Sequence, residues 1–151
     1  MPERATPTHV PERAAGEPLR GLARLRWARP TDRLEQVVAF YRDGLGLPVL
    51  TSFSGHAGYS GVILGLPDAG CQLEFTEHDA GSPCPAPTPD NLLVLYMDDR
   101  AAHQALVDRM HAGGHQTVAP ENPYWEHHAA TFVDPDGWRV VVALAQHKEK
   151  A

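Results

Sequence analysis

The stretch Phe132-Val133-Asp134-Pro135-Asp136-Gly137-Trp138 decides the fold, because part of it occurs twice along the chain. Its Pro135-Asp136 pair precedes an apolar, strand-like run. Pro67-Asp68 precedes a similar run, so that the offset from position 67 to position 135 is 68 residues. The same offset carries Arg24 to Leu92, where another apolar run begins. Repetition at a fixed offset indicates that one supersecondary unit is used twice.

Each unit is predicted to form a strand, a helix and three further strands. In the first unit, a strand over residues 22–29 precedes a helix whose start Asp32 and Glu35 cap together. One face of this helix is apolar at 3.6-residue spacing, through Leu34, Val37, Val38, Tyr41 and Leu45. The closing strands are predicted near 48–54, 59–65 and 71–77.

The second unit repeats this order from residue 92. A strand at Leu92–Met97 leads to a helix that Asp98 or Asp99 caps. The closing strands are predicted near 116–119, 128–133 and 138–145.

The predicted fold class is α+β, with two tandem βαβββ modules that form a curved, cup-like mixed sheet with the helices outside. One βαβββ unit leaves a sheet face bare, so the two modules are expected to form a single domain over residues 21–146. The predicted boundaries, in chain order, are a disordered tail at 1–20, module one at 21–79, a proline-rich linker at 80–90, module two at 91–146 and a C-terminal tail at 147–151.

Composition excludes several partners. The net charge is −6, from 13 Lys+Arg against 19 Asp+Glu, whereas nucleic acids and anionic membranes call for a basic surface. No apolar run approaches the roughly 20 residues that a membrane span needs. The two cysteines, Cys71 and Cys84, are interpreted as free thiols, and with no signal peptide at the N-terminus the expected location is the cytoplasm.

Three motifs resemble the vicinal oxygen chelate superfamily, which contains glyoxalase I, bleomycin-resistance proteins and extradiol dioxygenases. The run Ala39-Phe40-Tyr41-Arg42-Asp43-Gly44-Leu45-Gly46-Leu47 resembles the superfamily's first helix, and Phe132–Trp138 resembles its last β-turn. Asn122-Pro123-Tyr124-Trp125 is similar to one small branch. The resemblance covers about residues 22–144 and implies a small-molecule ligand in the cup and a homodimer.

The resemblance also implies four metal-binding positions, which are usually His, Gln or Glu. They fall on Arg26, Glu74, Leu92 and Val141. Arg26 is a permanent cation, and Leu92 and Val141 carry no donor atom, so only Glu74 can coordinate a metal ion. A hard divalent ion needs several oxygen or nitrogen ligands. No metal and no other cofactor is therefore predicted.

The cup is predicted to present one polar and one apolar half to a ligand. Arg26 and Glu74 project to the same side, either as a ligand-binding pair or as a self-satisfied ion pair. His127 and His128 are adjacent, so one of them is expected to point inward; a metal site that combines one of them with His56 stays open. The predicted ligand-binding residues are Arg26, Tyr59, Glu74, Leu92, Tyr96, Tyr124, Trp125, His127 and Val141.

Three functions are compatible with this lining. The leading hypothesis is a metal-free protein that binds a small amphipathic organic ligand, as the bleomycin-resistance members do. The second is an enzyme of the superfamily, a lyase, an isomerase or a dioxygenase-like activity, with Glu74 as the catalytic general base. The third is a protein-interaction module. The fold alone does not choose among them.

Overall fold

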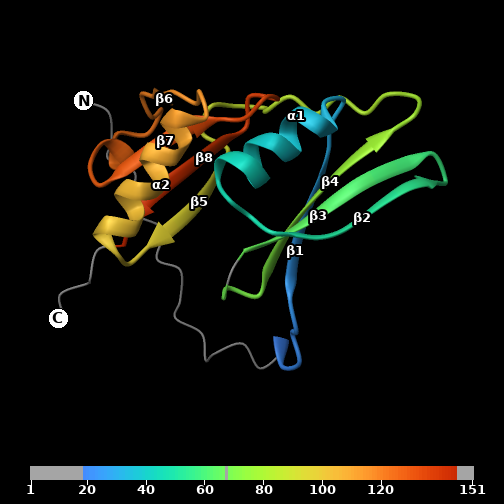
Figure 1. Cartoon of the computed structure of the whole chain (residues 1–151), viewed down its shortest axis with the longest axis horizontal. Coiled ribbons are helices and arrows are strands. Elements are labelled where there is room, and N and C mark those ends of the chain that lie inside the picture. Colours follow the sequence, from blue (N-terminus) through green and yellow to red (C-terminus); the bar gives the residue numbers. More distant parts are fainter. Residues whose placement is uncertain (1–18, 67, 146–151) are drawn as a thin grey trace, which may run out of the picture.

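The computed structural model describes residues 19–66 and 68–145 (Figure 1). The predicted tails at 1–20 and 147–151 lie outside the described residues, apart from Leu19 and Arg20, and so does Pro67. Within the described ranges, no helix is long and apolar enough to cross a membrane.

The predicted order of elements is confirmed in both modules. Module one consists of β1 (Leu25–Pro30), α1 (Leu34–Val38), the π-helical turn η2 (Ala39–Gly44), β2 (Val49–His56), β3 (Tyr59–Leu66) and β4 (Cys71–His78). Module two consists of β5 (Leu92–Met97), α2 (Arg100–Ala112), β6 (Thr117–Val118), the 3₁₀ turn η3 (Pro123–Glu126), β7 (Ala129–Val133) and β8 (Arg139–Leu144). The α+β class with a repeated unit is thus correct.

The strands are divided between two four-stranded mixed sheets. Their orders, β1-β4-β3-β2 and β5-β8-β7-β6, are the same when counted within each module. β1 and β5 are edge strands, and no described strand pairs with a strand of the other sheet. Figure 1 shows the two sheets diverging, with α1 between them. Each sheet therefore carries its own half of the predicted cup.

The core lies on the helix-covered faces of the two sheets and is continuous between the modules. Alternation along β4 buries Leu73 and Phe75 in this core and leaves Gln72 and Glu74 on the opposite side, here called the open face. The core includes residues of both modules, among them Val37, Phe40, Tyr41, Leu64, Leu73, Phe75, Met110, Phe132, Val140 and Val142.

The two helices begin differently from each other. Asp99 caps α2, because its carboxylate accepts a hydrogen bond from the Ala102 amide at 2.7 Å. The predicted capping box of Asp32 and Glu35 is wrong: α1 has no side-chain cap, and the Asp32 carboxylate accepts from the Ser82 amide. Asp32 therefore ties the segment between β4 and β5 to the residues before α1 instead of capping the helix.

A buried ionic cluster joins the modules. Arg29, on β1, is 2% exposed. Its guanidinium donates to Asp134 Oδ2 at 2.5 Å and to Asp136 Oδ2 at 2.6 Å, both in the turn between β7 and β8. The Tyr41 hydroxyl donates to the same Asp134 oxygen at 2.9 Å, and the amides of Asp136 and Trp138 donate to its other oxygen. The turn that marks the repeat in the sequence thus also holds module two against β1.

Burial changes the acid–base properties of this cluster. It raises the pKa of the Tyr41 hydroxyl well above its usual value, and the negative charge of Asp134 raises it further. Burial likewise raises the pKa of Asp134, although the charge of Arg29 and the Tyr41 hydrogen bond act in the opposite direction. Tyr41 therefore stays protonated in the folded state at pH values where an unfolded tyrosine is ionised.

The difference in unfolding free energy between the wild type and Tyr41→Phe should shrink above about pH 10. Unfolded Tyr41 loses its proton near its usual pKa of 10.0, whereas folded Tyr41 keeps it. Ionisation of Tyr41 therefore stabilises the unfolded state of the wild type at alkaline pH, and Tyr41→Phe lacks this effect. The shrinkage approaches about 1.4 kcal/mol per pH unit. Urea unfolding of both proteins between about pH 8 and 11 measures it. If the unfolding free energies of the two proteins changed with pH in parallel, the buried state of Tyr41 would be contradicted.

Candidate functional site

The open face of the first sheet carries a polar cluster. β1 and β4 are parallel, with Arg26 beside Gln72 and Ala28 beside Glu74. Arg26 Nε and Nη2 donate to Gln72 Oε1 at 3.0 and 2.8 Å, and Nη1 lies 3.4 Å from Glu74 Oε2. The side chains of Arg26 and Glu74 are 38% and 18% exposed. The structure thus brings the predicted charged pair together and adds Gln72 as a second partner of Arg26.

The four superfamily metal positions do not fit a divalent ion. Glu74 has the positively charged Arg26 guanidinium 3.4 Å from its Oε2 atom. Leu92 lies on β5, and Val141 is fully buried on β8; neither offers a ligand atom. Among residues 19–66 and 68–145, no three His, Cys, Asp or Glu side chains are grouped so that they could hold a metal ion.

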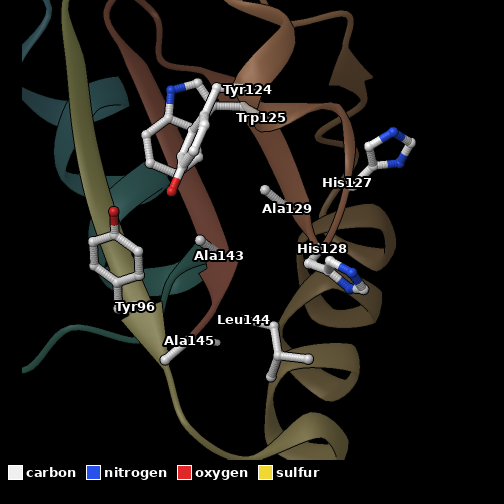
Figure 2. A pocket seen from close by; sticks show the side chains of 9 residues that line it. All are labelled: Tyr96, Tyr124, Trp125, His127, His128, Ala129, Ala143, Leu144 and Ala145. Atoms are coloured by element: carbon white, nitrogen blue, oxygen red, sulfur yellow. The ribbon is translucent and has the colours of Figure 1, made fainter. Parts of the chain in front are cut away.

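The open face of the second sheet holds a cavity of about 450 Å³ (Figure 2). The strand register explains the hollow, because Tyr96 on β5 lies beside Ala143 on β8, which in turn lies beside Ala129 on β7. Two alanines in adjacent strands leave a shallow floor, and larger side chains form the walls. The cavity is lined by Tyr96, Tyr124, Trp125, His127, His128, Ala129, Ala143, Leu144 and Ala145.

The turn η3 supplies two of these walls, and its sequence explains its shape. Asn122 caps it, because its side chain accepts from the Tyr124 amide at 3.0 Å and its carbonyl accepts from the Trp125 amide at 3.1 Å. Pro123 occupies the first position, where a missing amide is tolerated. The Asn-Pro-Tyr-Trp motif therefore folds into a short 3₁₀ turn that places two aromatic rings over the second sheet.

Three aromatic rings make one side of this cavity. The ring centre of Trp125 lies 4.8 Å from that of Tyr124, with the two rings edge-on, and 6.2 Å from that of Tyr96, with the ring planes at 51°. Figure 2 shows the rings of Tyr96, Tyr124 and Trp125 gathered on the same side. Tyr96 is 63% exposed and Tyr124 is 73% exposed. Exposed, neighbouring aromatic rings are typical of sites that bind a flat apolar group.

Both histidines of the pair border this cavity, although strand alternation predicted only one of them. His128 has a backbone φ of 59°, in the left-handed region, so the pair does not alternate as a strand would. Figure 2 shows the rings of His127 and His128 on the side away from the aromatic rings. His56 ends β2, in the other sheet, where it pairs with Tyr59. The sequence offered no signal for the left-handed His128.

The remaining predicted ligand residues lie elsewhere. Tyr59, at the β2–β3 hairpin, packs its ring 4.6 Å from His78. Arg26 and Leu92 together border a second cavity of about 530 Å³ at the junction of the modules, with Trp27 and Arg139. No cavity found among the described residues contains all nine predicted residues, because the two open faces belong to separate sheets. Of the nine predicted residues, Tyr96, Tyr124, Trp125 and His127 lie together around the cavity of the second sheet.

Two family models match the chain, one in each module. The YycE-like N-terminal domain matches residues 25–76, and the YycE-like C-terminal domain matches residues 90–143. The uncharacterised protein YycE of Bacillus subtilis (strain 168) is 45% identical over 119 residues, which are 79% of this chain and 86% of YycE. A crystal structure of a YycE protein from Bacillus subtilis is 42% identical, has a TM-score of 0.78, and covers 85% of this chain and 94% of that chain.

More distant solved structures share the fold. Glyoxalase I of Leishmania major is 21% identical with a TM-score of 0.61, covering 80% of this chain and 84% of that chain. TnmS3, an antibiotic-binding protein from Streptomyces sp. CB03234, is 23% identical with a TM-score of 0.59, covering 82% of this chain and 95% of that chain. At these identities the similarity is one of architecture.

Proposed function

Since this chain belongs to the YycE-like family and has the fold of the vicinal oxygen chelate superfamily, we propose that it binds a small amphipathic organic ligand without a divalent metal ion. The observation that carries this proposal is the cavity beside η3, where Tyr96, Tyr124 and Trp125 present exposed aromatic surface over a floor of alanines. Aromatic rings with polar edges suit a flat apolar ligand that also bears polar groups. TnmS3, with the same fold, is an antibiotic-binding protein, which agrees with this mode of action.

The metal-free part of the proposal rests on the polar cluster. Glu74 is the only superfamily metal position with a ligand atom, and its carboxylate is paired with Arg26. The same contact argues against the enzymatic alternative, in which Glu74 would take a proton from a substrate as the general base. A carboxylate that is ion-paired beside Gln72 is better suited to holding Arg26 in place.

Ligand binding is expected to raise the melting temperature of the protein. The melting temperature is measured with a panel of flat aromatic compounds, of which 2-naphthol is the simplest. Fosfomycin and bleomycin are tested beside them, because proteins with this fold include fosfomycin-resistance and bleomycin-resistance members. At about 100 times its Kd, a bound compound stabilises the protein by about 2.7 kcal/mol, which is a shift of roughly 5–10 °C. Protein treated with EDTA should respond equally. If no aromatic compound shifts the melting temperature, or if EDTA abolishes the shift, the proposal is wrong.

A homodimer is part of the same proposal. β1 and β5 are edge strands, and edge strands with apolar neighbours tend to be covered. Leu22, Leu25 and Trp27, at and beside β1, are 63%, 60% and 38% exposed. A second copy seated on this edge would bury these side chains. Sedimentation velocity tests this part separately, since a monomer at micromolar concentration would exclude it.

A further inference from the structure

Thr131, on β7, has a buried hydroxyl with no hydrogen-bond partner. The residue is 2% exposed, and its Oγ1 contacts no donor or acceptor. Most buried polar atoms in folded proteins are paired, and an unpaired one lowers stability. Valine has nearly the same shape and would fill this place without that penalty. The hydroxyl therefore calls for a functional explanation.

The register places this hydroxyl under the aromatic turn. Thr131 lies beside Val141 on β8 and beside Val118 on β6, so its side chain is on the open face of the second sheet. It borders a cavity of about 420 Å³ that is also lined by Trp125 and Glu126.

This cavity adjoins the aromatic one. The two share Trp125, His127 and Ala129, so Trp125 borders both spaces. A ligand that stacks on Trp125 is therefore adjacent to the wall that contains Thr131.

We propose that Thr131 is a specificity-determining residue, whose hydroxyl binds an uncharged hydrogen-bonding group on a ligand stacked against Trp125. This inference rests on the proposed function and names the chemistry of the ligand. A hydroxyl both donates and accepts, so it matches a hydroxyl, carbonyl or amide group.

The group that reaches Thr131 carries no charge. Thr131 is flanked by Val118 and Val141, and a charged group there would lose its hydration without gaining a counter-charge. The charged or titratable side chains of this cavity, Glu126 and His127, are exposed. Charged parts of the ligand therefore stay at the rim.

Two probes of similar shape test this inference by calorimetric titration of the full chain. 2-Naphthol carries a hydroxyl where 2-methylnaphthalene carries a methyl group. The wild type should bind 2-naphthol about five- to tenfold more tightly than 2-methylnaphthalene, as expected for one hydrogen bond. In Thr131→Val this preference should fall to about one, whereas Thr131→Ser, which keeps the hydroxyl, should retain it.

The outcomes separate this inference from the proposed function. A preference that is unchanged in Thr131→Val overturns the role of Thr131 and leaves the aromatic site intact. Binding of neither probe to the wild type overturns both. Thr131→Val should also melt at or above the wild-type temperature, because it removes an unpaired buried hydroxyl. A lower melting temperature would mean that the hydroxyl has a partner in the protein, which overturns the inference.

Discussion

Replacing Arg29 with methionine is expected to lower the free energy of unfolding by about 3–5 kcal/mol. The substitution keeps much of the side-chain volume but leaves Asp134 and Asp136 without the cation that both of them contact. A carboxylate that is buried without its partner is far less stable than one in water. Because the cluster joins β1 to the turn between β7 and β8, the loss also loosens module two from module one. Urea unfolding followed by circular dichroism measures the change.

Arg26→Met is the matched control. Arg26 lies on the same strand and also pairs with a carboxylate, but its side chain is 38% exposed. An exposed ion pair contributes about 0–1 kcal/mol, so this variant should unfold close to the wild type. If the two variants lost equal stability, the central role of the Arg29 cluster would be excluded.

Trp125→Ala should weaken binding of 2-naphthol by about 30-fold or more. Trp125 borders both cavities on the open face of the second sheet and contacts the rings of Tyr96 and Tyr124. Removing a central aromatic residue from a binding site commonly costs about 2 kcal/mol or more in affinity. Calorimetric titration of the variant and the wild type measures the change.

Tyr59→Ala serves as the control for this loss. Tyr59 is also an exposed aromatic residue, but it packs against His78 in the other sheet. Its removal should change the affinity for 2-naphthol by less than about twofold, since it makes no contact with the proposed site. A large loss in Tyr59→Ala together with normal binding by Trp125→Ala would move the ligand to the first sheet.

Local patterns in the sequence predicted the elements well. The strand Leu92–Met97 has the predicted bounds, and Arg26 and Glu74 project to the same side of the first sheet, as strand alternation predicted. Asp99 caps α2 as one of the two predicted candidates. These features depend on neighbours within a few residues, so single-sequence periodicity and capping rules were sufficient to predict them.

Features that depend on distant partners were not predictable in this way. The burial of Arg29 follows from two aspartates more than 100 positions later in the chain, and nothing in its local sequence distinguishes it from Arg26. Asp32 does not cap α1, and its carboxylate instead accepts a hydrogen bond from the amide of Ser82, 50 positions later in the chain. The predicted ligand residues are divided between two places because the two sheets are separate, and no local sequence pattern encodes that separation.

A crystal structure of the protein with bound 2-naphthol would decide where and how the ligand is held. We predict that its rings lie against Trp125 in the second sheet, that its hydroxyl reaches Thr131, and that Glu74 still contacts Arg26 with no metal ion between them. Density for the ligand against Arg26 and Glu74, or a metal ion coordinated by Glu74, would contradict the proposed function.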